Sequence, residues 1–409
     1  MDRFPATPVI VFGAFDRHNF GDLLFPHIVS ALLPGQPLIF AGLVERDLRQ
    51  WGGHRVRALP TVLRSWQGPA PIVLHAGGEL LTCNAWEAAI MLQPHVFAQT
   101  VIDRLHGQAD RQDAWAANYL HIGDGAPYLA NAAYFPQGTR ILYNAVGGVD
   151  LDIKSEKFLD EVTAKLHGAD FVGVRDKISL SHLQQAGVPA LLMPDPAALT
   201  RRVCGLQIAG RATQGDVASV RAVFPQGYVA VQCSADFGDD ATLDILEDQL
   251  RRISLETGLG IVLFRAGLAP WHDEQEVYER LAIHFSRDDV RVFQSAYLWD
   301  ICALIASSRA YCGSSLHGRI VAMSYGLPRV NLVQADLLAG AGKQAAYAAS
   351  WDRSDLVAVA PPAILHSALM QALAFSDETR QSIAENCANR YGKCFIQLCE
   401  AAGIGQMPE

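Results

Sequence analysis

Residues 310–332 read AYCGSSLHGRIVAMSYGLPRVNL, and this stretch decides the fold class. A short apolar run ends at Gly313, and a helical stretch follows it. Gly326 and Pro328 stop that helix, and a second apolar run begins at Arg329. A glycine turn between an apolar strand and a helix is typical of the strand–helix–strand unit, whose two strands are parallel. The stretch therefore predicts an α/β protein.

Similar short apolar runs occur along the rest of the chain and form two series. The first series lies at 9–12, 71–75, 140–146 and 171–174, and the second at 228–232, 260–264, 290–293, 310–312 and 329–332. Continuous apolar strands that end in glycine turns favour parallel sheets with helices on both faces. We therefore expect two Rossmann-like domains that face each other across a cleft, which is where a ligand would bind.

The predicted domain boundaries follow from composition. The N-terminal Rossmann-like domain is expected at 1–200, the inter-domain region at 201–226, the C-terminal Rossmann-like domain at 227–375 and a C-terminal helix that packs back across the domains at 376–409. Residues 84–139 form an excursion that is long for a loop and contains two helical patterns. This excursion either covers the substrate or is a surface insertion. Its Trp86 and Trp115 either stack on a sugar ring or belong to a core.

Composition limits the partners and the compartment. The 409 residues carry a net charge of −9, which argues against a general nucleic-acid binder. Arginine outnumbers lysine 27 to 6, so bidentate recognition of a small anion is available locally. The eight cysteines form no CxxC pair, and no apolar run reaches the length of a membrane span. We expect a cytoplasmic protein with reduced thiols, for which only peripheral membrane association is open.

Three stretches carry candidate site residues. The first is the turn GAFDRHNFGD at 13–22, where Asn19 and Asp22 either serve a ligand at a helix start or act as turn and cap residues. In the second, Arg175 ends a strand and either grips an anion or pairs with Asp176. Glu79, after another strand, either faces an acceptor or caps the next segment.

The third stretch carries the strongest signal. Ser314, Ser315, His317 and Arg319 gather at the start of the helix in the opening stretch. Hydroxyl groups, helix-start amides, a guanidinium and an imidazole together make an anion pocket with a proton donor. Downstream of Arg265, Asp273 is expected to be a helix N-cap.

Taken in their order along the chain, the motifs resemble those of the polysaccharide pyruvyl transferases. The matching pieces are GAFDRHNFGD, LHAGGELL at 74–81, YNAVGG at 143–148, VGVRDKISLSHLQQAGV at 172–188, PDPA at 194–197 and SSLHGRIVAMSYGLPRV at 314–330. Lys343 stands at about the distance at which the family has a lysine. One departure is that Ser315-Leu316-His317 replaces the Arg-Leu-His of many members.

The resemblance implies a GT-B-like fold and the transfer of pyruvate from phosphoenolpyruvate to a saccharide as a ketal, in cell-surface or exopolysaccharide biosynthesis. It also implies that Arg175, His317 and Lys343 stand at or near the donor site, with the acceptor on the N-terminal domain. The guanidinium missing at Ser315 would come from Arg319 or Arg265.

These residue types suit that chemistry. Phosphoenolpyruvate is a carboxylate and a phosphate in one molecule, and Arg175, Arg265, Arg319 and Lys343 are the cations available to it. His317 is the expected general acid and base, assisted by Asp22. We expect no cofactor and no metal ion. The acceptor would be a saccharide or a lipid-linked oligosaccharide.

Two other functions remain open on sequence grounds. One is a GT-B glycosyltransferase that uses a nucleotide sugar, although no convincing acidic residue for the nucleotide is present. The other is a non-catalytic relative that binds an anion or a partner protein, which the serine at position 315 would favour.

Overall fold

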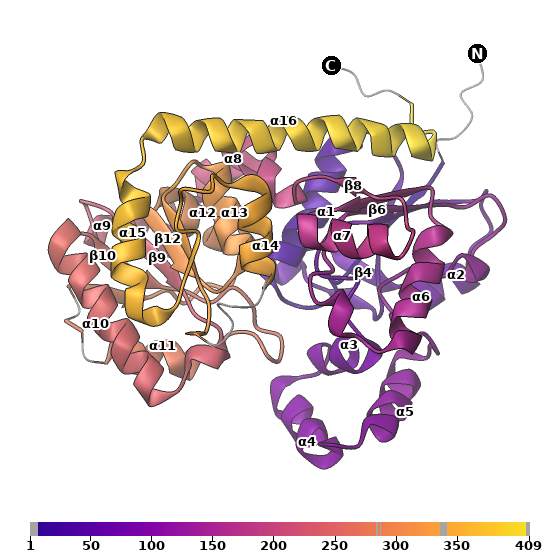
Figure 1. The fold of residues 1–409 in the computed structure, drawn as a ribbon, viewed down its shortest axis with the longest axis horizontal. Coiled ribbons are helices and arrows are strands. Elements are labelled where there is room, and N and C mark those ends of the chain that lie inside the picture. Colours follow the sequence, from indigo (N-terminus) through magenta and orange to yellow (C-terminus); the bar gives the residue numbers. More distant parts are fainter. Residues whose placement is uncertain (1–6, 284, 287, 336–341, 406–409) are drawn as a thin grey trace. The chain divides into compact units, whose positions relative to one another are not determined.

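The structure is a computed structural model that describes residues 7–283, 285–286, 288–335 and 342–405. These residues form two compact units, each built on its own sheet (Figure 1). The described residues of the first unit are 7–18, 22–196 and 390–405, and those of the second are 19–21, 197–283, 285–286, 288–335 and 342–389. The prediction of two α/β units is confirmed.

Within its described residues, the first unit contains an eight-stranded sheet in the order β3-β4-β2-β1-β5-β6-β7-β8. The strands are β1 (Val9–Phe12), β2 (Leu38–Gly42), β3 (Arg46–Asp47), β4 (Arg55–Ala58), β5 (Ile72–His75), β6 (Arg140–Val146), β7 (Phe171–Val174) and β8 (Leu191–Leu192). All neighbours are parallel except β3 and β4. Every residue of β1 and β5 is buried, as expected for central strands that are covered on both faces.

The first unit's helices lie between these strands. They are α1 (Phe20–Leu32), α2 (Leu59–Arg64), α3 (Ala85–Met91), α4 (His95–Leu105), α5 (Ala109–Leu120), α6 (Glu156–His167) and α7 (Lys177–Gln185). The first two residues of α1 belong to the second unit. Helix α7 begins after Asp176, whose side chain accepts a hydrogen bond from the Ser179 amide at 2.7 Å. Asp176 is therefore the N-cap of α7.

The excursion at 84–139 is helical in its first part. Pro94 separates α3 from α4, and α4 and α5 extend away from the rest of the first unit (Figure 1). A small core of Ile90, Ala98, Val101 and Leu105 holds these helices together. Trp86 and Trp115 pack against this core with their rings 5.5 Å apart, so both contribute to packing.

Within its described residues, the second unit contains a six-stranded parallel sheet in the order β11-β10-β9-β12-β13-β14. The strands are β9 (Tyr228–Gln232), β10 (Gly260–Leu263), β11 (Val290–Val292), β12 (Ala310–Gly313), β13 (Arg329–Leu332) and β14 (Val359–Ala360). The order reverses at β9, because β10 follows it on one side and β12 pairs with it on the other. In open α/β sheets such a switch point is where ligands bind, outside the carboxyl ends of the strands.

The second unit's helices include the segment expected to be an inter-domain region. They are α8 (Thr200–Arg211), α9 (Gly215–Val223), α10 (Asp240–Thr257), α11 (Gln275–Ala282), α12 (Leu298–Ser307), α13 (Leu316–Ser324), α14 (Lys343–Trp351), α15 (Leu365–Ala374) and residues 377–389 of α16 (Asp377–Ala402). Within that segment, α8 and α9 have buried apolar faces that include Cys204, Ile208 and Val217.

The C-terminal helix α16 contributes to both units. Arg380 donates a hydrogen bond to the Gly326 carbonyl at 3.0 Å in the second unit. Tyr391 donates to the Asn144 side chain at 3.0 Å in the first. All eight cysteines are buried free thiols. Among the described residues, no helix combines the length and the hydropathy that crossing a bilayer requires.

Candidate functional site

The candidate site lies at the switch point of the second unit's sheet. Gln232 ends β9, Arg265 follows β10, and Ser314 follows β12. Because the strands are parallel, these three residues lie at the same end of the sheet, at the carboxyl ends of the strands.

Gln232 is buried, and its side chain links the segments that follow these strands. Its side-chain oxygen accepts hydrogen bonds from the Ser315 amide at 2.7 Å and from the Ser314 hydroxyl at 3.2 Å. Its side-chain nitrogen donates to Oδ1 of Asp273 at 2.7 Å. One amide therefore connects the start of α13 to the loop before α11.

Asp273 holds the loop that carries Arg265, a role that the sequence did not reveal. Its Oδ2 accepts hydrogen bonds from the amides of Ala266 and Gly267, while Glu274 is the N-cap of α11. The prediction of Asp273 as that N-cap was wrong. Burial raises the pKa of Asp273 to about 7, against the hydrogen bonds that favour its charged form.

The start of α13 is fixed by its serines. Ser315 is the N-cap, with its hydroxyl accepting from the Gly318 amide at 3.2 Å. The Ser314 hydroxyl accepts from the Ser234 amide at 2.9 Å. Both predicted ligand-binding serines thus have partners within the protein. The two serines fix the position of the N-terminus of α13, and the amides there favour an anion.

His317 is the second residue of α13, and its side chain is almost buried, with 8% of the residue exposed. A Cβ atom on Gly21 would overlap its ring, so Gly21 and the imidazole lie in direct contact within the second unit. Asn19 belongs to the same contact region. It forms an antiparallel bridge with Gly267, and its side chain accepts from the Gly21 amide at 3.0 Å.

Two of the four predicted donor-binding cations have no ionic partner among the residues that the structure describes. Arg265 is partly buried and Lys343 is exposed, and within the described part of the chain neither forms an ion pair or a hydrogen bond through its side chain. Ala266, next to Arg265, is held by Asp273. Gln344, next to Lys343, donates to the Ser314 carbonyl at 2.8 Å. Both cations therefore come from segments that are tied to the α13 start.

Arg319 differs from these two, although it also lies in α13. It is 1% exposed and forms an ion pair with Asp352, which Arg329 also contacts. Burial by itself would raise the pKa of Asp352, but the two guanidinium groups outweigh it and lower that pKa. Arg319 thus fastens α13 and β13 to the end of α14.

Arg175 and Glu79 lie in the first unit and contact each other. Arg175 is 1% exposed, forms an ion pair with Glu79 and lies 3.4 Å from Oδ2 of Asp195. Glu79 also accepts from the Val149 amide at 3.3 Å. A side chain at Gly147 would collide with both Glu79 and Arg175, so the backbone of this turn passes close over the pair.

Asp22 also lies in the first unit, in the first turn of α1. It is buried, and its Oδ2 is 3.7 Å from Nη2 of Arg17. Arg17 in turn donates to the Tyr128 hydroxyl at 3.1 Å, and that hydroxyl donates to the buried Asp16 at 2.8 Å. The turn at 13–22 is therefore a polar cluster in which Asp22 has a cationic neighbour.

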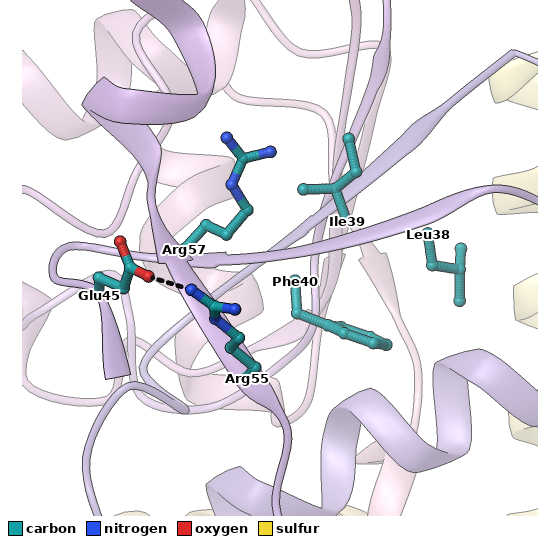
Figure 2. Close-up of a pocket in the computed structure, with 6 residues that line it drawn as sticks. All are labelled: Leu38, Ile39, Phe40, Glu45, Arg55 and Arg57. Carbon is teal, nitrogen blue, oxygen red and sulfur yellow. Dashed lines mark hydrogen bonds and ion pairs between the residues drawn. The ribbon is translucent and has the colours of Figure 1, made fainter. Parts of the chain in front are cut away.

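A pocket of about 370 Å³ opens elsewhere on the first unit, beside β2 and β4 (Figure 2). It is lined by Leu38, Ile39, Phe40, Glu45, Arg55 and Arg57. Glu45 and Arg55 form an ion pair of 2.9 Å, which is the dashed line in Figure 2. None of the predicted site residues lines this pocket.

Comparisons with known proteins agree with the fold and the motifs. A family model described as polysaccharide pyruvyl transferase matches residues 19–334. UDP-N-acetylglucosamine 2-epimerase from Rickettsia bellii has a similar structure, with a TM-score of 0.56 and 10% identity over 97% of this chain and 96% of that one.

Two further structures have the same architecture. A putative UDP-N-acetylglucosamine 2-epimerase from Listeria monocytogenes gives a TM-score of 0.51 at 12% identity, covering 99% of each chain. HepE from Anabaena, solved with UDP-glucose, gives 0.51 at 11% identity, covering 97% of this chain and 99% of that one. At these identities the likeness shows the GT-B-type fold alone. No curated protein matches the sequence.

Proposed function

The chain belongs to the polysaccharide pyruvyl transferase family, and we propose that it transfers pyruvate from phosphoenolpyruvate to a saccharide as a ketal. The observation that carries the proposal is the position of Arg265 and Lys343, two cations with no ionic partner among the described residues, on segments tied to the start of α13. Phosphoenolpyruvate presents a carboxylate and a phosphate, so it needs more than one cation. The amides of the α13 start add further donors for an anion.

The departure at Ser315 fits this arrangement. The structure commits Arg319 to Asp352, so Arg265 is the better source of the guanidinium that many family members carry at position 315. Ser315 itself is the N-cap of α13. The serine at this position therefore does not favour a non-catalytic relative.

His317 is the proposed general acid and base. Ketal formation begins when a proton is added to the methylene carbon of the donor and a sugar hydroxyl bonds to the adjacent carbon. The carbon–oxygen bond to phosphate then breaks, and a second hydroxyl of the sugar takes the place of the phosphate. An imidazole suits these proton transfers, since it gains and loses a proton near neutral pH. The ring of His317 lies directly against Gly21.

The first unit is proposed to serve the acceptor. Asp22 is our candidate for the group that assists the attacking hydroxyl, and Glu79 for a group that faces the sugar. Arg175 is balanced by Glu79 and Asp195, so we assign it to the support of Glu79 rather than to direct neutralisation of phosphate.

Phosphate release tests the proposal. The protein is incubated with phosphoenolpyruvate and a panel of free and lipid-linked saccharides, and inorganic phosphate is measured. The proposal predicts release that depends on both a saccharide and the enzyme. Thermal shifts with phosphoenolpyruvate and with UDP-glucose compare the two donor classes, because a ligand that binds the folded protein raises its unfolding temperature. A shift with UDP-glucose alone, together with no phosphate release, would favour a nucleotide-sugar glycosyltransferase.

A further inference from the structure

The pair Gln232 and Asp273 connects the two sides of the proposed donor site. On one side lies the loop at 265–267, which carries Arg265 and whose amides bond to Asp273. On the other lies the start of α13, which precedes His317 and whose Ser315 amide bonds to Gln232. The two side chains meet at 2.7 Å between Nε2 of Gln232 and Oδ1 of Asp273.

The backbone amides at the two ends of this series of hydrogen bonds set the direction of every bond in it. Backbone amides can only donate, so Asp273 must accept at the loop and Gln232 must accept at Ser315. The remaining bond is then a donation from the Gln232 amide to the Asp273 carboxylate. Gln232 is 2% exposed, so water offers little replacement for a lost partner.

We propose that Gln232 and Asp273 are positioning residues, whose hydrogen-bonded chain sets the placement of Arg265 relative to His317 and thereby the affinity for the donor. The inference rests on the proposed function, because it assigns these two residues to the same donor site. Neither is proposed to touch phosphoenolpyruvate. Their effect is transmitted through Ala266 on one side and Ser315 on the other.

An exchange of the two chemical groups tests this proposal. Gln232→Glu places a second carboxylate against Asp273 and removes the donor, while Asp273→Asn turns an amide donor towards the amide of Gln232. The double variant restores one donor and a full set of acceptors, since an asparagine at 273 can donate to a glutamate at 232. Its net charge also equals that of the wild type.

Charge alone predicts a different pattern. Gln232→Glu adds a negative charge near an anion site, and Asp273→Asn removes one, so simple electrostatics predicts weaker binding for the first and tighter binding for the second. A positioning role predicts weaker binding for both. We expect each single variant to raise the dissociation constant of phosphoenolpyruvate about 10- to 100-fold, and the double variant to return within about threefold of the wild type.

The measurement is calorimetric titration of the full-length proteins at pH 8.5, where Asp273 is ionised, with thermal unfolding recorded in parallel. Gln249→Leu is the control, because Gln249 is a buried glutamine in the same unit that accepts a hydrogen bond from the His366 amide at 3.1 Å, outside the site. This variant should lose stability and keep the wild-type affinity. A merely structural role for Gln232 and Asp273 would make their variants behave in the same way.

Inorganic phosphate as a second titrant separates the two proposals. If the wild type binds phosphate but not phosphoenolpyruvate, the proposed donor is wrong. The single and double variants are then compared by their dissociation constants for phosphate. The positioning role is overturned if either single variant binds as the wild type does, if Asp273→Asn binds more tightly, or if the double variant stays weak. It is also overturned if the wild type binds neither anion.

Discussion

The imidazole of His317 occupies the space that a side chain on Gly21 would need. Gly21 lies in the first turn of α1, where alanine would ordinarily suit a helix better than glycine. Glycine at this position is therefore explained by the close approach of His317 and not by the local backbone.

Gly21→Ala is expected to displace the ring of His317 and to lower phosphoenolpyruvate-dependent phosphate release about 100-fold, because a small misplacement of a reacting group is costly. The matched control is Gly205→Ala in α8, where an added Cβ meets nothing within 4 Å. The control should keep full activity. Equal activity of the two variants would show that the Gly21 contact does not matter for catalysis.

His317→Ala removes the proposed acid and base. We expect kcat to fall about 100- to 10,000-fold, while circular dichroism shows a folded protein. Steady-state rates of phosphate release measure the effect. Activity within tenfold of the wild type would rule out His317 as the proton donor.

Asp352→Asn tests the assignment of Arg319 to structure. The variant leaves the buried Arg319 and Arg329 without their carboxylate, so we expect a loss of about 3–5 kcal/mol in the free energy of unfolding. Urea denaturation measures it. Asp355→Asn is the control, because it breaks a pair with Arg353 that is exposed to solvent. If the control lost as much stability, the buried cluster would have no special role.

His75 predicts a pH dependence of stability. Its Nδ1 lies 3.0 Å from the Leu142 carbonyl, its Nε2 accepts from the Ala130 amide at 3.0 Å, and burial lowers its pKa to about 3. The folded state keeps this imidazole neutral, whereas the unfolded chain takes up a proton below its ordinary pKa of 6.5. Stability is therefore lost as the pH falls from about 6.5 towards 3, by up to about 1.4 kcal/mol for each pH unit.

Urea denaturation at several pH values checks this dependence. His75→Gln should flatten the stability curve below pH 6.5, and His167→Gln, at an exposed histidine, should leave it unchanged. A wild-type slope that survives in His75→Gln would assign the acid sensitivity to other groups.

The fold was largely predictable because its central strands are continuous apolar runs. Strands such as β1 and β9 are buried on both faces and stand out in the sequence. The sequence did not indicate β4, because Arg55-Val56-Arg57 alternates charged and apolar residues at the side of the sheet. Strands of two residues, such as β8, carry too little pattern to be found.

The site was predicted in part. The sequence placed Ser314, Ser315 and His317 together because they are neighbours on one helix start. It could not separate Arg265 from Arg319, since the difference lies in Asp352, which is 33 residues away from Arg319 along the chain. It also missed Gln232 and Asp273, whose meeting depends on strands brought together by the sheet. A polar residue at the end of an apolar strand was the one signal for Gln232.

In the proposed function, Arg265 and Lys343 bind the donor. The most direct test is calorimetric titration of phosphoenolpyruvate into the double variant Arg265→Gln/Lys343→Gln, with Lys157→Gln/Arg252→Gln, at two exposed positions, as a control of equal charge. We predict that the dissociation constant rises about 100-fold or more in the first variant, since two charge-assisted contacts are lost, and stays at the wild-type value in the control. Wild-type affinity in Arg265→Gln/Lys343→Gln would contradict the account.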